Sequence, residues 1–334
     1  MDTHKPKPWR DYLMSVAVLA AALGGAPATA QVAVADPGTD MSVAHPAYAR
    51  DKGPIVGVDA GHNNYHTIEG RYGPFANVLR NDGYRVVSVP TRTDAAALRG
   101  LSVLVVANAL AASNLTAWKL PTPSAFDEPE IEVIRRWVSG GGALFLIADH
   151  LPFAGAATDL GAAFGFRFDN DYAGKGDGRQ PEIFSRAAGT LADNEITRGS
   201  GLAPPVDHVE TFAGSSFRGP AGTIPIMVLD EGWTLLFPEE AGKFGAATPQ
   251  RTATRDDLRG AALIYGKGRV VVVSEAALFT NQLVKGAPYG FGRPSARQDK
   301  QLLINIVEWL SRAPRKGADP ARARLSPSAQ ATPH

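Results

Sequence analysis

Hydrophobic positions along residues 51–312 follow two alternating patterns. Residues 55–59, 101–107 and 143–148 form short runs that are apolar at nearly every position, and residues 85–89 form a β-branched run. Such runs are typical of strands that are buried on both faces. The stretches between them repeat apolar residues at helical spacing. This alternation predicts a doubly wound α/β fold, with a parallel sheet covered by helices on both faces.

Local chemistry marks the ends of the predicted helices. Asp127, Glu128 and Pro129 open one helix. Acids stabilise the positive end of the helix dipole, and proline fits the first helical positions. The glycines at 140–142 end this helix. A last helix is predicted over residues 302–310, whose large apolar residues share one face.

The second half of the chain is richer in strand patterns. Candidate strands lie at residues 206–212, 223–229, 233–237, 261–265 and 269–273. The last two flank the sequence Gly266-Lys267-Gly268, which predicts a hairpin turn. No linker separates the two halves, so we expect one domain with a strand-rich C-terminal elaboration.

The N-terminus has the features of an export signal. Basic residues precede an apolar run at 15–22, and Ala28-Thr29-Ala30 matches a cleavage site. We predict a signal peptide at residues 1–30, so that the mature protein is exported, and periplasmic where the host has two membranes. The apolar run is shorter than the roughly 20 residues that span a bilayer, so no stable membrane insertion is expected after cleavage. Residues 31–50 are interpreted as a linker, and residues 313–334 as a disordered basic tail.

Composition removes several classes of function. The chain of 334 residues has 34 Lys and Arg against 33 Asp and Glu, a formal net charge of +1, which does not favour nucleic acid as a partner. It has no cysteine, which excludes disulfides, thiolate metal sites and a cysteine nucleophile. Any chemistry must therefore use imidazole, carboxylate or amide groups in place of a thiol.

Four of the seven histidines lie in the predicted domain, beside carboxylates or amides. Asp59 closes the first strand and precedes His62, Asn63, Asn64 and His66. Histidine is the side chain best suited to proton transfer and metal ligation near neutral pH. The spacing of His62 and His66 would suit zinc on a helix, but the neighbouring Gly61 and the amides indicate a loop, so a metal and any other cofactor stay undetermined.

Two further strand ends carry polar residues. Asp149 and His150 follow the strand at 143–148, and Glu275 follows the strand at 269–273. Ligands of open α/β sheets bind beyond the carboxyl ends of the strands, near the point where the strand order reverses. We therefore expect these segments to share a crevice. The candidate catalytic residues are His62, His150, Asp149 and Glu275, and the candidate ligand-binding residues are Asp59, Asn63, Asn64 and His66.

Structural roles are open for the same residues. Asp59 would also serve as a cap, the two asparagines as turn residues, and Glu275 as an acid in the first turn of a helix over residues 276–281 with Ser274 as its N-cap. His208 and Glu210 alternate with an apolar residue, as in a half-exposed strand. Arg71 and Tyr72 are further candidates to lie near the first loop.

Familiar catalytic motifs are missing. The chain has no G-x-S-x-G elbow and no G-x-G-x-x-G after a strand, which counts against an α/β-hydrolase esterase and a dinucleotide enzyme. The glycine-rich residues 174–178 lack the order of a phosphate-binding loop, so we interpret them as a plain loop.

Four stretches together resemble an uncharacterised exported bacterial family of the class I glutamine amidotransferase-like superfamily, in the group that includes GIFT domains. They are residues 59–64 (Asp59-Ala60-Gly61-His62-Asn63-Asn64), 146–157, 266–280 and 301–310. The resemblance implies a three-layer flavodoxin-like fold and no established activity. Glutamine amidotransferases use a cysteine nucleophile that this chain lacks, so their route to glutamine hydrolysis is excluded. The resemblance also implies that members without the nucleophile are candidates for carbohydrate binding or a scaffold role.

Three functions follow from these observations. The first is binding of a small polar ligand, such as a carbohydrate or cell-wall fragment, without glutaminase activity. The second is a His- and Asp-dependent hydrolase, with or without a metal, in which His62 or His150 is the general base. The third is an envelope assembly or interaction protein.

Overall fold

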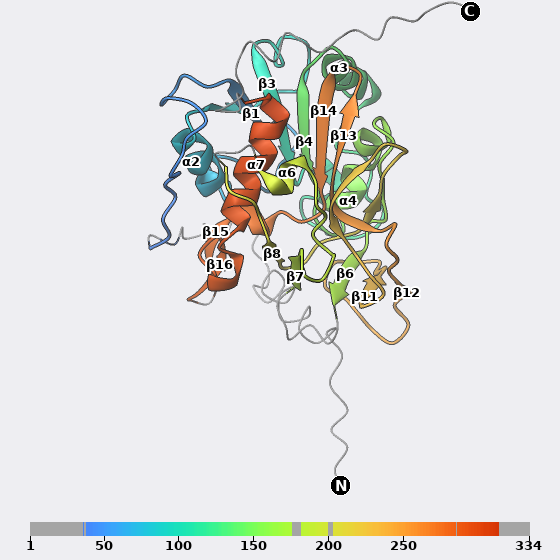
Figure 1. The fold of residues 1–334 in the computed structure, drawn as a ribbon. Helices are drawn as coiled ribbons and strands as arrows, with labels where there is room; N and C mark the ends of the chain where they lie inside the picture. The colour runs from blue at the N-terminus through green and yellow to red at the C-terminus, as the bar shows by residue number, and fades with distance from the viewer. Residues whose placement is uncertain (1–35, 37, 176–181, 200–202, 285, 314–334) are drawn as a thin grey trace, which may run out of the picture.

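The computed structural model describes residues 36, 38–175, 182–199, 203–284 and 286–313 (Figure 1). Its largest sheet has nine strands, in the order β2-β1-β3-β4-β14-β13-β9-β5, with β10 paired to β13. These strands are β1 (Ile55–Asp59), β2 (Arg85–Val89), β3 (Leu101–Ala107), β4 (Ala143–Ile147), β5 (Arg167–Phe168), β9 (Phe217–Arg218), β10 (Ile224–Val228), β13 (Leu258–Tyr265) and β14 (Gly268–Val273). The first five in the spatial order pair in parallel, and the other strand pairs of this sheet are antiparallel. The predicted mixed α/β fold, mostly parallel at its centre and elaborated by further strands, is confirmed.

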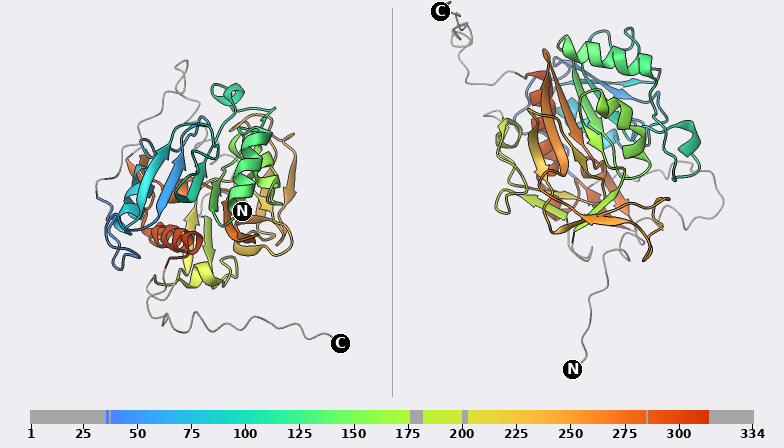
Figure 2. Two further views of the ribbon diagram at one scale, coloured as in Figure 1. Left: turned by 90° about the horizontal axis from the view of Figure 1, so that it is seen from above. Right: turned by 90° about the vertical axis from the view of Figure 1, so that its right-hand side faces the viewer.

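Helices cover both faces of this sheet (Figure 2). They are α2 (Gly73–Asn81) and α7 (Asp299–Ser311) on one face, and α3 (Glu128–Ser139), α4 (Phe153–Ala156) and α5 (Thr158–Ala162) on the other. In β3, Val103 and Val105 pack into the core beneath α2 and α7, whereas Leu104 and Val106 pack into the core beneath α3. A strand that buries both faces must be apolar at successive positions, which is the pattern seen in the sequence.

Local chemistry forms α3 where the sequence predicts it. The Asp127 carboxylate accepts a hydrogen bond from the Glu130 N–H (3.0 Å), and the Glu130 carboxylate accepts one from the Asp127 N–H (3.3 Å). This reciprocal capping box satisfies backbone donors that a helix start leaves free. The predicted hairpin between β13 and β14 is also confirmed, with Gly266 at a φ of +59° that favours glycine.

Between β5 and β13, besides β9 and β10, the described residues form small strands and one short helix outside the large sheet. They are β6 (Tyr172–Lys175), β7 (Glu182–Ser185), α6 (Glu195–Arg198), β8 (His208–Thr211), β11 (Trp233–Leu236) and β12 (Gln250–Thr252). The observed β8, β10 and β11 fall inside the predicted strands at 206–212, 223–229 and 233–237, and each is shorter.

The helix that would follow Ser274 at 276–281 is only a 3-10 turn, Ala277–Phe279. Glu275 rather than Ser274 caps it, because its carboxylate accepts hydrogen bonds from the Ala277 and Leu278 N–H groups (2.7 and 2.9 Å). The chain then enters a hairpin of β15 (Asn281–Val284) and β16 (Ala287–Gly290), which replaces the rest of the predicted helix.

Part of the predicted linker lies against the domain. Met41, Val43 and Tyr48 pack on the core beneath α2, and Asp82 accepts a hydrogen bond from the Ala47 N–H (2.7 Å). The predicted signal peptide and basic tail lie outside the described residues.

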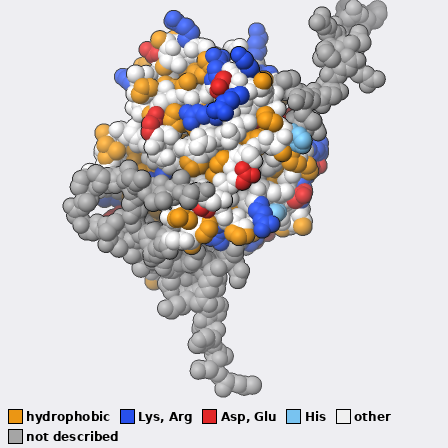
Figure 3. Space-filling model, turned by 90° about the vertical axis from the view of Figure 1, so that its left-hand side faces the viewer, with side chains coloured by type: hydrophobic (Ala, Val, Ile, Leu, Met, Phe, Trp, Pro, Cys, Tyr) orange, Lys and Arg blue, Asp and Glu red, His pale blue; other side chains and the backbone are white. Residues whose placement is uncertain are grey.

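Among the helices that are described, none is long and apolar enough to cross a membrane. On the face shown in Figure 3, charged side chains of both signs are interspersed, with Lys and Arg more numerous toward the top.

Candidate ligand-binding site at the carboxyl edge of the sheet

Neighbouring parallel strands end in polar residues at one edge of the sheet. Asp59 ends β1, Asn108 follows β3, Asp149 lies two residues after β4, and Ser274 follows β14. The strand order reverses between β1 and β3, which is the position where open α/β sheets bind ligands. The sheet therefore gathers the predicted strand-end segments along one edge, and Asn108 joins them.

His62 is held between two carboxylates in a closed network, which we call the His62 cluster (Asp59, His62 and Glu130). Its Nδ1 lies 2.9 and 3.0 Å from the two Asp59 oxygens, and its Nε2 lies 3.0 Å from Glu130 Oε1. Burial alone would lower the pKa of His62, but its hydrogen bonds to Asp59 and Glu130 and their negative charges raise it overall. Arg92 pairs with Glu130 from outside (3.3 Å). Both ring nitrogens are occupied, so the His62 cluster fastens the loop after β1 to the start of α3.

The two asparagines support the same loop. Asn63 has a φ of +51°, which asparagine tolerates well, and its amide donates to the Leu110 carbonyl (3.2 Å). Asn64 donates to Asp59 Oδ2 (2.8 Å) and accepts from the His62 N–H (3.0 Å). The Asn64 side chain is thus engaged within the loop, whereas the exposed Asn63 lies at the surface.

His66 lies apart from the His62 cluster. It is buried against Tyr72, with ring centroids 4.8 Å apart, and its Nδ1 has no hydrogen-bond partner among the described residues. Burial lowers the pKa of His66 well below its ordinary value, and the charge of Arg71 lowers it further. Burial thus favours the neutral form of His66, and the spacing of four residues does not bring it together with His62.

Asn108 connects the β3 end to Asp149 and His150. Its side-chain oxygen accepts from the Asp149 N–H (2.9 Å), and Asp149 Oδ1 accepts from the His150 N–H (2.8 Å). Burial raises the pKa of Asp149, while the nearby His150 opposes the shift. His150 Nδ1 lies 2.7 Å from the Leu151 carbonyl, which requires a proton on Nδ1 and leaves the Nε2 lone pair free in the neutral ring.

Glu275 is buried beside a buried cation. Burial raises the pKa of Glu275 well above its ordinary value, and the charge of Asp149 raises it further. Arg259 from β13 is also fully buried, donates to the Ala173 carbonyl (2.9 Å) and lies 3.6 Å from Glu182. The side chains of Glu275 and Arg259 are both fully buried. The two carboxylate oxygens of Glu275 accept hydrogen bonds from backbone N–H groups in the turn that follows β14.

Aromatic side chains form the exposed part of this edge. We call the half-exposed residues Tyr65, Trp118, His150 and Phe244 the aromatic surface. Tyr65 lies edge-on to Trp118 (centroids 5.2 Å apart), and Trp118 lies 6.3 Å from His150. His150 stacks on the buried Tyr172 (4.1 Å), which also contacts Phe244 (5.0 Å). Loops after β1, β3 and β4 thus each contribute one ring.

The loop that carries Trp118 is fixed from below. The buried Asn114 amide donates to the carbonyls of Ala117 (3.1 Å), Lys119 (2.9 Å) and Pro121 (3.4 Å). The loop also pairs with the segment that precedes Phe244, through a hydrogen bond from the Ala241 N–H to the Trp118 carbonyl (2.7 Å). Trp118 and Phe244 are therefore held in place by backbone contacts.

The structure divides the predicted site residues into groups. Among the described residues, no hydrogen bond joins His62 to Asp149, His150 or Glu275. His208 and Glu210 lie in β8. The buried Glu210 pairs with Arg293 (3.0 Å), and the His208 N–H donates to Gln298 (2.9 Å), which are structural contacts.

Sequence reasoning did not identify Trp118, Phe244, Asn108, Glu130 or Arg259 as site residues. Asn108 had a signal in the sequence, since it directly follows the apolar strand predicted at 101–107. Arg259 lies two residues before the strand predicted at 261–265, so its signal was weaker. Trp118 and Phe244 had none, because both lie in irregular loops far from the edge in sequence.

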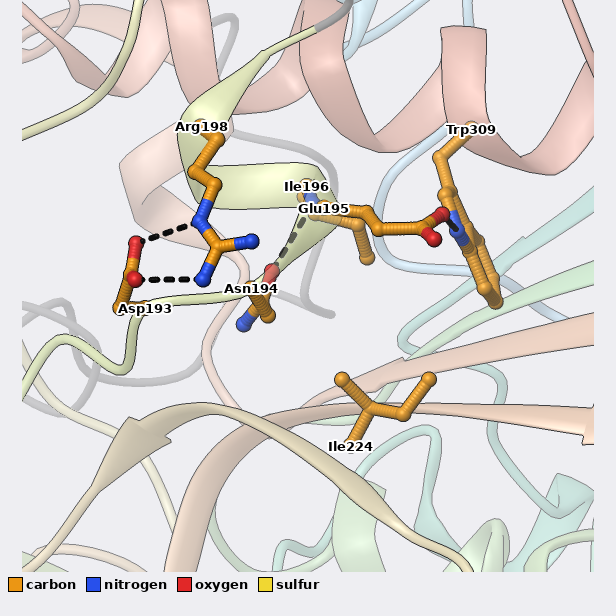
Figure 4. A pocket seen from close by; sticks show the side chains of 7 residues that line it. All are labelled: Asp193, Asn194, Glu195, Ile196, Arg198, Ile224 and Trp309. Atoms are coloured by element: carbon orange, nitrogen blue, oxygen red, sulfur yellow. Dashed lines mark hydrogen bonds and ion pairs between the residues drawn. The ribbon is translucent and has the colours of Figure 1, made fainter.

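A separate hollow lies between α6 and α7 (Figure 4). It has a volume of about 210 Å³ and is lined by Asp193, Asn194, Glu195, Ile196, Arg198, Ile224 and Trp309. Arg198 and Asp193 pair with each other there (2.6 Å). The hollow shares no residue with the carboxyl edge. Within the described ranges, no group of three or more His, Asp or Glu residues is placed to hold a metal ion.

The chain belongs to a family described as "Domain of unknown function (DUF4350)", whose model matches residues 72–286. A comparison with curated proteins found no match. Among solved structures, the chain is similar to the mmIFT52 N-terminal domain, at 13% identity and a TM-score of 0.53, over 77% of this chain and 97% of that one. This likeness shows the fold alone.

Two bacterial structures are more distant. Cytoplasmic Protein STM3548 from Salmonella typhimurium has a TM-score of 0.45 at 13% identity, over 77% of this chain and 98% of that one. A putative ThuA-like protein from Bacteroides uniformis has a TM-score of 0.40 at 13% identity, over 79% and 93%.

Proposed function

We propose that this chain is an exported binding domain that holds a carbohydrate on the aromatic surface. The observation that carries the proposal is the convergence of Tyr65, Trp118 and His150 from the loops after three adjacent parallel strands. Rigid aromatic side chains offer large contact areas at small entropic cost, and their negative π faces attract the weakly positive C–H groups of a sugar ring.

Polar groups beside the rings supply hydrogen bonds for hydroxyl groups. His150 Nε2 is a free acceptor in the neutral ring. The exposed Asn63, two residues before Tyr65, offers the part of its amide that the bond to the Leu110 carbonyl leaves available. His62, Asn64 and Glu275 are satisfied inside the protein, so in this proposal they support the loops and do not touch the ligand. The sequence analysis predicted that polar loop residues bind the ligand, whereas this proposal assigns most ligand contacts to the aromatic surface.

The proposal includes a three-layer flavodoxin-like fold of the class I glutamine amidotransferase-like kind. Its support is the order β2-β1-β3-β4-β14 of the parallel strands, which is the 2-1-3-4-5 order of flavodoxin-like sheets, and the helices on both faces. The chain lacks the cysteine that this kind of fold uses for glutamine hydrolysis, so the proposed function has no glutaminase activity.

A hydrolase is the second candidate, and the His150 tautomer favours it. A free Nε2 can act as a general base, and the Leu151 carbonyl orients the ring through Nδ1. The Asp149 carboxylate bonds to the His150 backbone N–H and not to the ring. Water would give a proton to His150 Nε2 and attack the anomeric carbon of the bound saccharide. The glycosidic C–O bond would break, and the leaving oxygen would take up a proton. A metal-assisted version has no ligand set of three among the described side chains to support it.

The test is binding of neutral oligosaccharides to the purified mature chain, on an array and then by calorimetry, with analysis of the products. Trp118→Ala should weaken binding at least about tenfold. Trp137→Ala is the matched control, since Trp137 is a half-buried tryptophan in α3 away from the aromatic surface. If no saccharide binds, or both variants lose binding equally, the proposal fails. Product that forms with the native chain but not with His150→Ala would replace it with the hydrolase.

Export is a separate part of the proposal, supported by the sequence at residues 1–30. The chain recovered from the periplasm of a two-membrane host should begin at Gln31. A full-length chain retained in the cytoplasm would contradict this part and leave the binding site untouched.

A further inference from the structure

Arg71 lies beside the aromatic surface in the loop between β1 and α2. The carbon at the centre of its guanidinium group is 4.0 Å from the centroid of the Tyr65 ring. The side chain is half-buried. Stacking occupies the flat face of a guanidinium group and leaves the N–H donors along its edges available. The Arg71 guanidinium group is therefore held in a position to donate hydrogen bonds to an acceptor that lies in its plane.

The charge of Arg71 is not balanced by an acid. No ion pair to Arg71 exists among the described residues, and the exposed Glu69, two residues away, makes none with it. Glu275 and Asp149 act on the adjacent Tyr72, but burial raises the pKa of both carboxyl groups, which weakens them as counter-ions.

The position of Arg71 before α2 further destabilises its positive charge. Arg71 lies two residues before the start of α2, at the positive end of the helix dipole, where an anion is preferred to a cation. The first turn of α2 has no acidic residue and no side-chain cap. The neighbouring His66 is buried and leaves Nδ1 without a partner among the described residues. The cation–π contact with Tyr65 offsets this cost only in part, since no acid balances the charge among the described residues. A local rule of electrostatics that is broken in this way is typical of a binding site.

We propose that Arg71 makes the site selective for saccharides that carry a carboxylate. The inference rests on the proposed function, because Arg71 meets the ligand only when a sugar lies on the aromatic surface beside Tyr65. A carboxylate accepts two parallel hydrogen bonds from a guanidinium group and neutralises its charge. A neutral sugar fills the aromatic surface but leaves Arg71 without a partner.

The test uses matched oligosaccharide pairs, trimers of a uronic acid and of the corresponding neutral hexose with the same linkage. The acidic trimer should bind the mature chain at least about tenfold more tightly, as expected for a charged hydrogen-bonded pair. Arg71→Gln should remove this preference and leave binding of the neutral trimer within about twofold. Arg167→Gln is the control for net charge, since Arg167 is exposed in β5 at the far edge of the sheet from β1.

The outcomes separate the two proposals. Equal binding of both trimers overturns the role of Arg71 and leaves carbohydrate binding intact. A preference that Arg71→Gln retains, or that Arg167→Gln abolishes equally, also overturns it. Binding of neither trimer, nor of any other matched pair, defeats both proposals. Arg71→Lys should retain only part of the preference, because lysine keeps the charge but lacks the planar fork.

Discussion

The His62 cluster and the aromatic surface follow neighbouring strands, yet their polar groups are satisfied to different degrees. In the His62 cluster, each ring nitrogen of a buried histidine lies within 3.0 Å of a carboxylate oxygen. In the aromatic surface, His150 has one nitrogen bonded to its own chain and one free, and its ring is partly exposed.

The difference shows how to separate structural from functional histidines. A buried polar network that is fully satisfied has no capacity left for a ligand, and it stabilises the loop that carries it. A partly exposed group with an unused donor or acceptor keeps that capacity. His62 has more neighbouring acids than His150 has. These acids occupy both of its ring nitrogens, so none is left for a ligand.

The largest expected effect is on stability, from His62→Ala. The substitution leaves the buried Asp59 and Glu130 carboxylates without their shared partner, and breaking a buried charge network costs about 3–5 kcal/mol. Urea unfolding followed by circular dichroism measures the loss. His150→Ala should cost about 1 kcal/mol or less in the same assay. Equal losses for the two variants would remove the distinction between the regions.

The next effect is on binding, from Trp118→Ala. Truncation of an anchoring aromatic residue should weaken the binding of a saccharide by about 2 kcal/mol, with a loss of unfolding free energy below about 1 kcal/mol. Calorimetry and urea unfolding on the same preparation measure both quantities. A large loss of stability with unchanged affinity would show that Trp118 belongs with the structural residues.

A smaller effect is expected from Asn114→Ala. The Trp118 loop would lose the two Asn114 N–H donors that its three carbonyls share, at a cost of about 1–2 kcal/mol. Hydrogen exchange in residues 115–120 should accelerate, and saccharide affinity should fall by several fold. Asn77→Ala, on the exposed side of α2, serves as the control. Unchanged exchange would mean that the loop is held by its backbone contacts alone.

The smallest effect is a dependence of stability on pH. The pKa of His62 in the folded chain is raised above its ordinary value of 6.5. Its stabilising contribution is therefore complete below about pH 6.5 and is lost as the pH rises through the folded pKa. Unfolding free energies of the native chain should decline over this range more steeply than those of His62→Gln. Parallel curves for the two chains would contradict a charged His62.

Much of the fold could be predicted from the sequence, because its strands and helices are encoded locally. The residues of β3 are apolar at successive positions since both faces are buried, and Asp127 with Glu130 forms a capping box within four residues. The turn after Glu275 was predicted less well, because a long-range hairpin, β15–β16, replaces the end of the expected helix.

The candidate site could be predicted only in part. The position of Asp59, Asp149 and Glu275 at strand ends follows from the alternation of strands and helices. The sequence does not show whether the hydrogen-bonding groups of each side chain are satisfied. The second partner of His62, beside the local Asp59, is Glu130, 68 residues away. Trp118 and Phe244 meet the edge through loops without a periodic pattern, so no local signal places them there.

The sequence by itself determined the alternating α/β order, the strand-end location of the polar residues and the absence of a thiol. These properties depend on residue type and on neighbours within a few positions. Only the tertiary structure decided which strand-end groups are enclosed and which are available, because hydrogen-bond partners and solvent exposure depend on contacts between distant segments. In the folded chain, His62 is a buried structural residue. His150, Trp118 and Arg71 are partly exposed to solvent.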